Sequence, residues 1–350
     1  MSAVLDNDRK AQLAGLYEEM QPDHLFPLWE VLAKLVVPEP QSPAMPARWS
    51  YETIRRFLLR SGDLISAEEA ERRVLILENP GLPGQSAITP RLYAGLQLIL
   101  PGEIAPCHRH SQSALRFVME GEGAYTAVDG EKAFMNRFDL ILTPNGRWHD
   151  HGHPGNKPMI WLDGLDIPIV RYLDAGFSDR LDQPSFPESA PPASTQMHYG
   201  RNMRPVRSMA AADKAPDVPL FHYPYAQWSE ALAAVSAHDA PDPWLGHALE
   251  FLNPADGGPV MATVSVGVRL IPAGFETGLR RSTEGAVYVV VEGAGQVEVD
   301  GTAIELAAGD IVVVPSWCAA RWQARQQLVL FTYSDRGVLE KLKLYKEALA

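Results

Sequence analysis

The sequence predicts a mainly β protein built from two copies of one small jelly-roll barrel, with helices at the N-terminus and between the copies. Three observations carry this prediction. The segment 98–130 aligns with 269–301, and the turn glycines Gly102 and Gly121 match Gly274 and Gly293. Apolar residues alternate with period two in the expected strands. Asp-Gly pairs lie between such runs, which is typical of β-hairpins.

Composition and charge restrict the class of protein. The 350 residues are 46% hydrophobic and 21% charged, which indicates a globular chain of about two domains. The net charge of −12 argues against nucleic acid and against anionic membranes as partners. The polar N-terminus lacks a signal peptide, and only two cysteines occur, Cys107 and Cys318. We therefore expect a cytoplasmic protein.

Residues 1–70 are expected to be a helical region. Leu13, Leu16, Tyr17 and Met20 follow helical spacing, and Ser66 with Glu69 forms a capping-box pattern. The expected elements are helices over 8–20, 25–36 and 51–60, a short helix from 66, and a strand over 74–77.

The first barrel is expected over 71–177, followed by a linker with a helix over 178–245 and a second barrel over 246–340. The linker is rich in Pro and Ser at 184–195, and its helix is predicted over 225–237. In the strand 92–100 the even positions are apolar and face the core. The odd positions, which then face a cavity, are Tyr93, Gly95 and Gln97.

Histidines gather in the first copy only. Five of the ten histidines lie within 102–153, in an H-x-H pair and a second group spaced by two. Residues two apart on a strand share a face, so such pairs can enclose a metal ion. The second copy keeps the framework but has Arg280, Ser282 and Ala320 in the aligned positions. The aligned residues of the first copy, predicted as ligands, are His108, His110 and His149.

Three neutral imidazoles leave open metal positions, which is typical of a catalytic rather than a structural site. Histidine ligands suit Fe, Zn, Cu or Ni and do not decide between them. The alternative is that these histidines only pack in the core or lie on the surface. Their absence from the second copy favours the metal site.

Strand parity extended from His110 places Arg116 on the same face, inside the barrel. A buried guanidinium needs an anion, and its planar fork suits a carboxylate. An acidic substrate is one candidate for that anion, and a structural ion pair with Asp163 is the other. Arg72 and Arg73 precede a strand and offer a second cation, with at least one of the two expected to face solvent.

These motifs resemble a known family. Gly102-x5-His108-x-His110 and Pro144-x-Gly146-x2-His149 resemble the two cupin motifs, in a variant with three histidines because Ala114 takes the place of the usual Glu. The strings HRHSQSALRF, WHDHG and MIWLDGLDIP make the chain similar to the gentisate 1,2-dioxygenase family of bicupins. The fold implied is two double-stranded β-helix barrels, and the quaternary structure implied is a homotetramer.

The resemblance implies an Fe(II)-dependent extradiol-type dioxygenase that cleaves the C1–C2 bond of a 2-hydroxybenzoate-type acid, foremost gentisate, to maleylpyruvate in aromatic catabolism. It implies catalytic roles for His151, Arg116 and Asp163. It also implies residues that contact the substrate. Taken together with the strand parity above, these are Arg72, Tyr93, Gly95, Gln97, Arg116 and His151.

Several alternatives remain open from the sequence. Salicylate or 1-hydroxy-2-naphthoate could be the substrate of the same chemistry, because the segment 145–148 departs from the more aromatic family pattern. A different cupin enzyme using Mn, Ni or Zn is a second reading, and a non-catalytic metal-binding sensor bicupin is a third. The roles of His153 and of the second barrel are not assigned.

Overall fold

The computed structural model describes residues 2–206, 208 and 218–350. The chain divides into two compact units, Met1–Gln41 and Ser42–Ala350, and the second unit contains both barrels. In the part of the chain that is described, no helix is both long and apolar enough to cross a membrane.

The first unit consists of two helices joined by a short turn: α1 (Ser2–Met20), η1 (Gln21–Asp23) and α2 (Leu28–Leu35). The hydroxyl of Tyr17 donates a hydrogen bond to Glu30 (2.7 Å) and accepts one from the Trp29 indole (2.8 Å), which ties α1 to α2. Apolar side chains of this unit stay exposed, among them Leu25, Phe26, Leu28, Trp29, Leu32, Leu35 and Val36.

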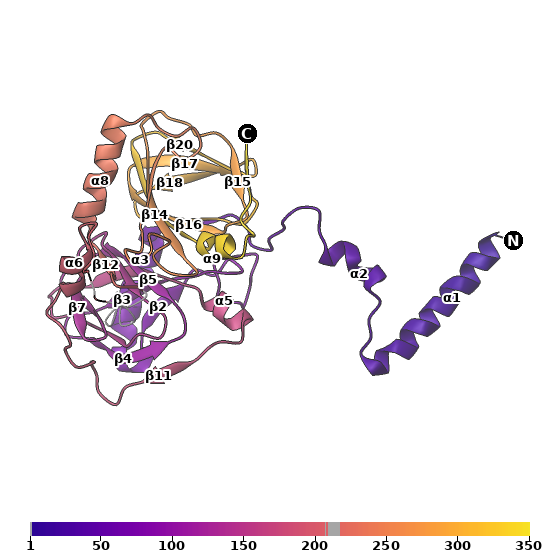
Figure 1. Cartoon of the computed structure of the whole chain (residues 1–350), viewed down its shortest axis with the longest axis horizontal. Coiled ribbons are helices and arrows are strands. Elements are labelled where there is room, and N and C mark those ends of the chain that lie inside the picture. Colours follow the sequence, from indigo (N-terminus) through magenta and orange to yellow (C-terminus); the bar gives the residue numbers. More distant parts are fainter. Residues whose placement is uncertain (1, 207, 209–217) are drawn as a thin grey trace. The chain divides into compact units, whose positions relative to one another are not determined.

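The N-terminal barrel is a sandwich of two antiparallel sheets (Figure 1). One sheet has the order β12 (His222–Tyr223), β8 (Leu140–Thr143), β5 (Ala114–Glu120), β10 (Met159–Leu165), β3 (Tyr93–Ile99) and β2 (Arg73–Ile76). The other has the order β11 (Ser178–Arg180), β4 (Ile104–His110), β9 (His149–Gly152), β6 (Tyr125–Val128) and β7 (Glu131–Phe134).

The C-terminal barrel repeats this arrangement. Its first sheet has the order β1 (Ala47–Trp49), β19 (Ile311–Val314), β16 (Ala286–Glu292), β21 (Leu328–Ser334), β14 (Ser265–Ile271) and β13 (His247–Glu250). Its second sheet has the order β18 (Thr302–Ala307), β17 (Ala294–Val299), β20 (Ala320–Ala324), β15 (Arg280–Ser282) and β22 (Glu347–Leu349). The remaining helices are α3 (Tyr51–Leu64), α4 (Ala67–Ala70), α5 (Ile167–Tyr172), α6 (Ser194–Tyr199), α8 (Tyr225–His238) and α9 (Arg336–Lys341).

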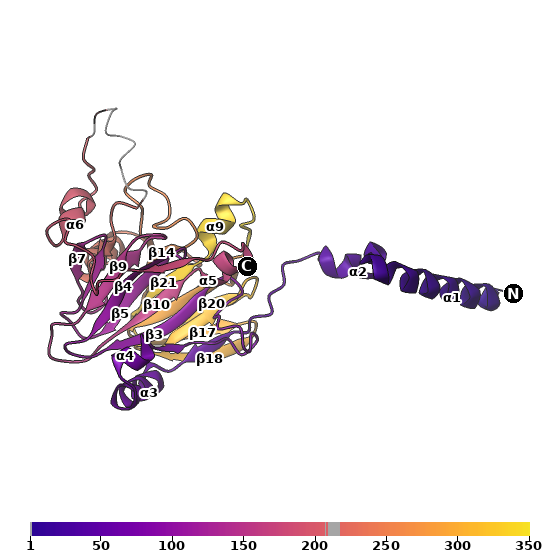
Figure 2. The same cartoon turned by 90° about the horizontal axis from the view of Figure 1, so that it is seen from below.

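The two barrels pack against each other through the sheets that contain β5 and β16 (Figure 1), and Figure 2 shows strands of both barrels overlapping when seen from below. One buried apolar cluster runs from β3, β5 and β10 into β14, β16 and β21. At its centre the rings of Phe117 and Phe331 stack with centroids 3.9 Å apart. The shared core makes the two barrels one unit, because either sheet alone would expose its apolar face to water.

Segments from outside each barrel complete its sheets. β1, from the N-terminal region, pairs with β19 of the C-terminal barrel. β12, from the segment between the barrels, pairs with β8 of the N-terminal barrel. β11 pairs with β4 along Ser178–Arg180, so this segment covers the strand that carries the H-x-H motif.

Most predicted elements are present at close to their predicted bounds. The capping box is confirmed, since Ser66 and Glu69 exchange side-chain to backbone hydrogen bonds. The second helix begins only at Leu28, since Pro27 lies in extended conformation as its N-cap. The predicted helical region 1–70 also contains β1, a strand that the sequence pattern did not indicate. Part of the predicted linker 178–245, residues 207 and 209–217, lies outside the described residues.

Candidate metal centre

His108, His110 and His149 converge on the inner face of the second sheet of the N-terminal barrel. β4 and β9 are adjacent, and His108 lies directly opposite His149 in their register. One ligand atom from each of the three rings lies within 4.8 Å of the other two. The structure thus brings together the three histidines that the sequence predicted as ligands.

The backbone fixes the orientation of each ring. The Nδ1 atoms lie near carbonyl oxygens two residues away: 3.2 Å for His108 and Pro106, 2.9 Å for His110 and Gln112, and 2.9 Å for His149 and Arg147. At His110 and His149 a protonated Nδ1 donates to these carbonyls, which leaves Nε2 as the lone pair, whereas both ring nitrogens of His108 also lie near Arg72. Nε2 of His149 is buried and has no hydrogen-bond partner. A buried imidazole nitrogen without a partner, beside two others, fits a metal ion.

The surroundings keep these rings neutral. Burial, followed by the charge of Arg72, lowers the pKa of His108 to about 3. Burial and Arg116 lower the pKa of His110 to about 4, and burial holds the pKa of His149 far below its ordinary value. Neutral imidazole is the form that binds a metal ion.

Arg116 lies on the opposite sheet and faces the triad. Asp163 is its direct neighbour in the β5–β10 register, and Nε of Arg116 lies 3.3 Å from Oδ1 of Asp163. The guanidinium also donates to the hydroxyl of Thr143. Both charged residues are buried, and burial raises the pKa of Asp163 to about 6 against the opposing effect of Arg116. The ion pair expected as one alternative is present.

Arg72 provides the second cation at the site. Its Nη2 atom lies 2.8 Å from Nδ1 and 3.1 Å from Nε2 of His108, so the guanidinium borders the triad. Neither arginine is exposed: Arg72 is half-buried, and Arg73 is buried in an ion pair with Glu103. The prediction that at least one of these two arginines faces solvent is therefore wrong, because an acidic partner lets Arg73 turn inward.

His151 is buried two residues beyond His149. Its Nδ1 lies 2.9 Å from the hydroxyl of Thr126, and that hydroxyl lies 3.4 Å from the sulfur of Met135. If the hydroxyl donates to sulfur, it accepts from Nδ1–H, which leaves Nε2 of His151 as an acceptor. That Nε2 is buried without a partner, and burial holds the pKa of the ring well below its ordinary value. A neutral imidazole with a free acceptor can take a hydrogen bond or a proton from a ligand.

Tyr93, Gly95 and Gln97 follow one another on the same face of β3, as the strand parity predicted. Asp163 pairs with Gly95 on one side and with Arg116 on the other, which places this face next to the guanidinium. A Cβ atom at Gly95 would lie 2.7 Å from the Tyr93 hydroxyl and 2.6 Å from a methyl of Val74. The glycine is therefore required by the close packing of these side chains.

Some residues at the site had not been singled out from the sequence. The indole of Trp161 donates to Asp163 (3.1 Å), and its ring centroid lies 5.7 Å from that of His151. Thr143 and Thr126 bind Arg116 and His151 as described. Trp161 is two residues before Asp163 on one strand, so parity could have identified it, whereas the two threonines depend on cross-strand neighbours.

Comparison with known proteins gives a consistent result. Residues 95–165 match the cupin domain model, and residues 272–330 match the EutQ-like cupin domain model. Gentisate 1,2 dioxygenase 1 of Aquipseudomonas alcaligenes is 45% identical over 332 residues, which covers 95% of both chains. The chain belongs to the gentisate 1,2-dioxygenase family of bicupins.

Some similar proteins are named for other hydroxybenzoate-type substrates. The 5-aminosalicylate 1,2-dioxygenase of a Comamonas species is 33% identical and covers 97% of this chain and 90% of its own length. The crystal structure of salicylate 1,2-dioxygenase from Pseudoaminobacter salicylatoxidans with gentisate superposes with a TM-score of 0.89 at 35% identity, covering 97% of this chain and 94% of that one. The chain is thus a bicupin ring-cleaving dioxygenase of the gentisate 1,2-dioxygenase type.

His153 lies outside the metal centre of this bicupin. Its Nε2 lies 2.5 Å from the carbonyl of Lys157, and its backbone pairs with Gly102 and Glu103. Cys107 is buried with its backbone bonded to Pro184 and Leu181 in the segment that covers β4. Both residues serve the packing of loops around the barrel, which explains why neither joins the triad.

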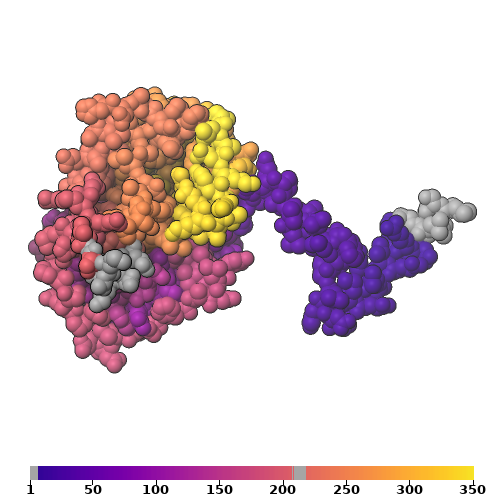
Figure 3. Space-filling model, viewed as in Figure 1, coloured from indigo at the N-terminus to yellow at the C-terminus, as the bar shows by residue number. Residues whose placement is uncertain are grey.

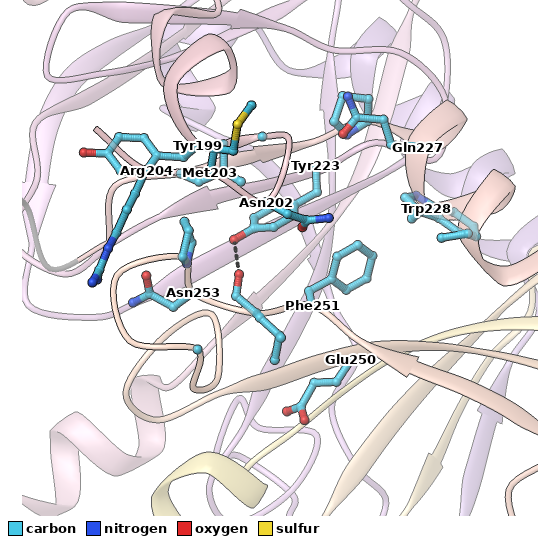
Figure 4. A pocket seen from close by; sticks show the side chains of 17 residues that line it. Tyr199, Asn202, Met203, Arg204, Tyr223, Gln227, Trp228, Glu250, Phe251 and Asn253 are labelled. Atoms are coloured by element: carbon cyan, nitrogen blue, oxygen red, sulfur yellow. Dashed lines mark hydrogen bonds between the residues drawn. The ribbon is translucent and has the colours of Figure 1, made fainter. Parts of the chain in front are cut away.

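A cavity with a volume of about 590 Å³ lies elsewhere in the bicupin. Figure 4 shows it between α6, α8 and the segment after β13, where the hydroxyl of Tyr223 donates to the carbonyl of Leu252. Its lining contains none of the predicted site residues, so it is separate from the metal centre.

Proposed function

We propose that the chain is an Fe(II)-dependent, extradiol-type gentisate 1,2-dioxygenase, which cleaves the C1–C2 bond of gentisate with O2 to give maleylpyruvate. The observation that carries this proposal is the histidine triad, which faces the buried guanidinium of Arg116 across the barrel and is bordered by the half-buried Arg72. The triad suits a metal with open positions, and the guanidiniums suit an aromatic carboxylate.

The proposed metal ligands are His108, His110 and His149. Fe(II) held there would supply the redox chemistry that couples an electron-rich ring to O2. The neutral, backbone-oriented imidazoles are the contribution of the protein, because they need no proton loss to bind the ion.

The proposed role of Arg116 is to bind the substrate carboxylate, with Asp163 and Thr143 holding its guanidinium in place. Arg72 would add a second positive charge at the edge of the triad. In a water-poor barrel these charges attract an anion more strongly than they would in bulk water.

The proposed role of His151 is to accept a hydrogen bond or a proton from a substrate hydroxyl through its free Nε2. Tyr93, Gly95 and Gln97 would form the wall beside the ring, with Gly95 allowing the Tyr93 side chain to pack close to the strand. The polar end of the substrate would then lie toward the arginines and its ring along β3.

A panel of acids tests the proposal. The iron-loaded protein is expected to consume O2 with gentisate at a higher kcat/KM than with salicylate, 5-aminosalicylate or 1-hydroxy-2-naphthoate. Because two relatives carry the names of other hydroxy acids, a higher value for one of these acids would replace gentisate as the substrate. If the protein consumes O2 with none of these acids, the proposal that it is a dioxygenase is contradicted.

We also propose a homotetramer, with the domain bounds 71–177, 178–245 and 246–340 after the N-terminal region. The exposed Phe26 and Trp29 of the first unit support an interface there, being 71% and 63% exposed. Both cysteines are free thiols, which suits a cytoplasmic enzyme. Light scattering of the full chain and of a form starting at residue 42 tests the assembly: the shortened chain is expected to have the lower mass.

A further inference from the structure

The C-terminal barrel keeps a polar cavity where the N-terminal barrel holds its histidines. The cavity has a volume of about 180 Å³ and continues into a smaller space lined by Ala320 and Trp322. In the aligned positions Arg280, Ser282 and Ala320 replace the three ligands, as the repeat showed. Because none of these three side chains carries an imidazole, the cavity is better suited to a ligand other than a metal ion.

The register of the strands explains why the space is open. Ser265 pairs with Ser334, Gly267 with Thr332 and Arg269 with Leu330 along β14 and β21. Ala286 and Tyr288 of β16 continue the first two of these rows. Small residues, Gly267 and Ala286, occupy one position in each row, so the inner face is hollowed between larger neighbours.

Arg269 is the charged group that the cavity leaves without an acidic partner. It is buried, and its guanidinium donates to the carbonyls of Leu245 (2.8 Å) and Trp244 (3.1 Å). Its Cζ atom lies 6.0 Å from the ring of Tyr288 and 5.6 Å from the ring of Trp322. No carboxylate within residues 2–206, 208 and 218–350 forms an ion pair with it. A buried cation without a counter-charge is costly, and an anionic ligand would offset that cost.

Among the other charged residues that line the cavity, Arg280 and Arg336 are paired with carboxylates and Glu250 is exposed. Arg280 forms ion pairs with Glu284 (2.8 Å) and Glu347 (2.6 Å). Glu284 also accepts hydrogen bonds from Ser282 and Ser334. Glu284 forms no ion pair with Arg269 and acts on it through its charge alone, and burial still lowers the pKa of the Arg269 guanidinium against this attraction and a side-chain hydrogen bond with Tyr288.

A second polar group in the cavity lacks a partner. Ser265 is 6% exposed, and its hydroxyl oxygen is buried with no hydrogen bond. Buried hydroxyls are usually hydrogen-bonded, so this one is available for a ligand atom. Leu245, Ala248 and Leu249 add apolar surface to the same cavity.

We propose that the C-terminal barrel binds a small aromatic carboxylate, with the carboxylate on Arg269, the ring beside Tyr288 and a hydrogen bond from Ser265. The cavity volume of about 180 Å³ leaves room for a single-ring acid. Figure 3 shows the C-terminal segment, in yellow, beside the orange residues of this barrel. This second site does not depend on the proposed reaction.

The direct test is a crystal of the full-length protein soaked with 4-bromobenzoate, whose bromine is located by anomalous scattering. A bromine peak inside the C-terminal barrel, with the carboxylate on Arg269, is expected. A peak confined to the N-terminal barrel, or no peak at all, overturns the proposal. The wild-type chain is used, so failed folding of a variant cannot obscure the result.

Calorimetric titration with 4-bromobenzoate gives the second readout. The Arg116→Gln protein removes the carboxylate site of the first barrel and is expected to retain one bound acid per chain. Adding Arg269→Gln is expected to weaken that binding at least tenfold. Adding Arg321→Gln instead, which changes an exposed arginine of the same barrel paired with Glu298, is the matched control and is expected to change nothing. Equal affinities in the two double variants overturn the proposal, whatever the outcome of the O2 assays.

Discussion

At the scale of single residues, the site is defined by atoms that lack partners and by neighbours that orient them. The Nε2 atoms of His149 and His151 are both buried without hydrogen bonds, yet their Nδ1 atoms have different neighbours. A backbone carbonyl orients His149, whereas the hydroxyl of Thr126 orients His151. The repeat alignment predicted His149 as a ligand, but the spacing of the histidines alone could not separate it from the neighbouring His151 and His153, whose surroundings depend on cross-strand contacts.

The metal ligands can be tested against a histidine of the same segment. His149→Ala is expected to reduce bound iron to less than a tenth of the wild-type amount, because two imidazoles and water hold the ion too weakly. His153→Gln is the control, since this buried ring is hydrogen-bonded to the Lys157 carbonyl outside the triad and its loss should leave iron bound. Elemental analysis after anaerobic loading measures both. Equal iron content in the two variants would contradict the assignment.

The role of Arg116 is tested by separating substrate binding from metal binding. Arg116→Gln is expected to raise KM for the acid roughly 10- to 100-fold, the loss of a buried charge-assisted contact of about 1.5–3 kcal/mol. Iron content should stay near the wild-type value. Arg109→Gln is the control, because Arg109 has the opposite strand parity and pairs with Asp179 outside the barrel. Steady-state kinetics and iron analysis are the two measurements. If the variant loses iron and affinity for the acid together, Arg116 has a structural role instead.

At the scale of elements, the strands that carry the site were predictable and their supports were not. The alternation in 92–100 predicted β3 and the face that carries Tyr93, Gly95 and Gln97. The covering strand β11 and the added strand β1 have only three residues each, too short for a periodic signal. They form because each pairs with the free edge of a sheet, and the residues that make up that sheet lie elsewhere in the chain.

One support comes from the C-terminal barrel. The buried hydroxyl of Tyr333 donates to the carbonyl of Tyr93 (2.9 Å), at the start of β3. Tyr333→Phe is expected to lower the free energy of unfolding by about 1 kcal/mol and to raise KM, since the Tyr93 carbonyl loses its partner.

The control for this variant is Tyr223→Phe, which removes a similar hydroxyl bonded to the Leu252 carbonyl far from the triad. It should cost comparable stability and leave KM unchanged. Denaturant unfolding and steady-state kinetics provide the two readouts. An unchanged KM in Tyr333→Phe would show that the C-terminal barrel does not influence the wall of the site.

At the scale of the whole molecule, the internal repeat predicted two barrels and the loss of histidines predicted one metal site. The repeat could not predict which sheets meet, because each barrel has several strands with an apolar face. The structure shows that β5 and β16 lie at a common core and that side chains cross between barrels. Arg91 of the N-terminal barrel pairs with the buried Asp335 of the C-terminal barrel at 2.6 Å.

This ion pair gives a pH-dependent prediction. Burial raises the pKa of Asp335 from 3.8 to about 6, and Arg91 only partly opposes it. A raised pKa in the folded state means that the contribution of this group to stability is complete below pH 3.8 and is lost as the pH rises through 6. Between pH 5 and pH 8 the stability of the wild type relative to Asp335→Asn should fall by about 1–2 kcal/mol. Denaturant unfolding of both proteins measures the difference, and a difference that grows with pH would contradict this assignment.

The central claim is that the histidine triad of the first barrel carries out ring cleavage with O2. An oxygen electrode, with iron-loaded protein and a limiting amount of gentisate, tests it most directly. The account predicts that one O2 is consumed per gentisate and that His108→Ala, given the same iron, consumes none. Continued O2 uptake by His108→Ala, or no uptake by the wild type with any hydroxybenzoate, would contradict it.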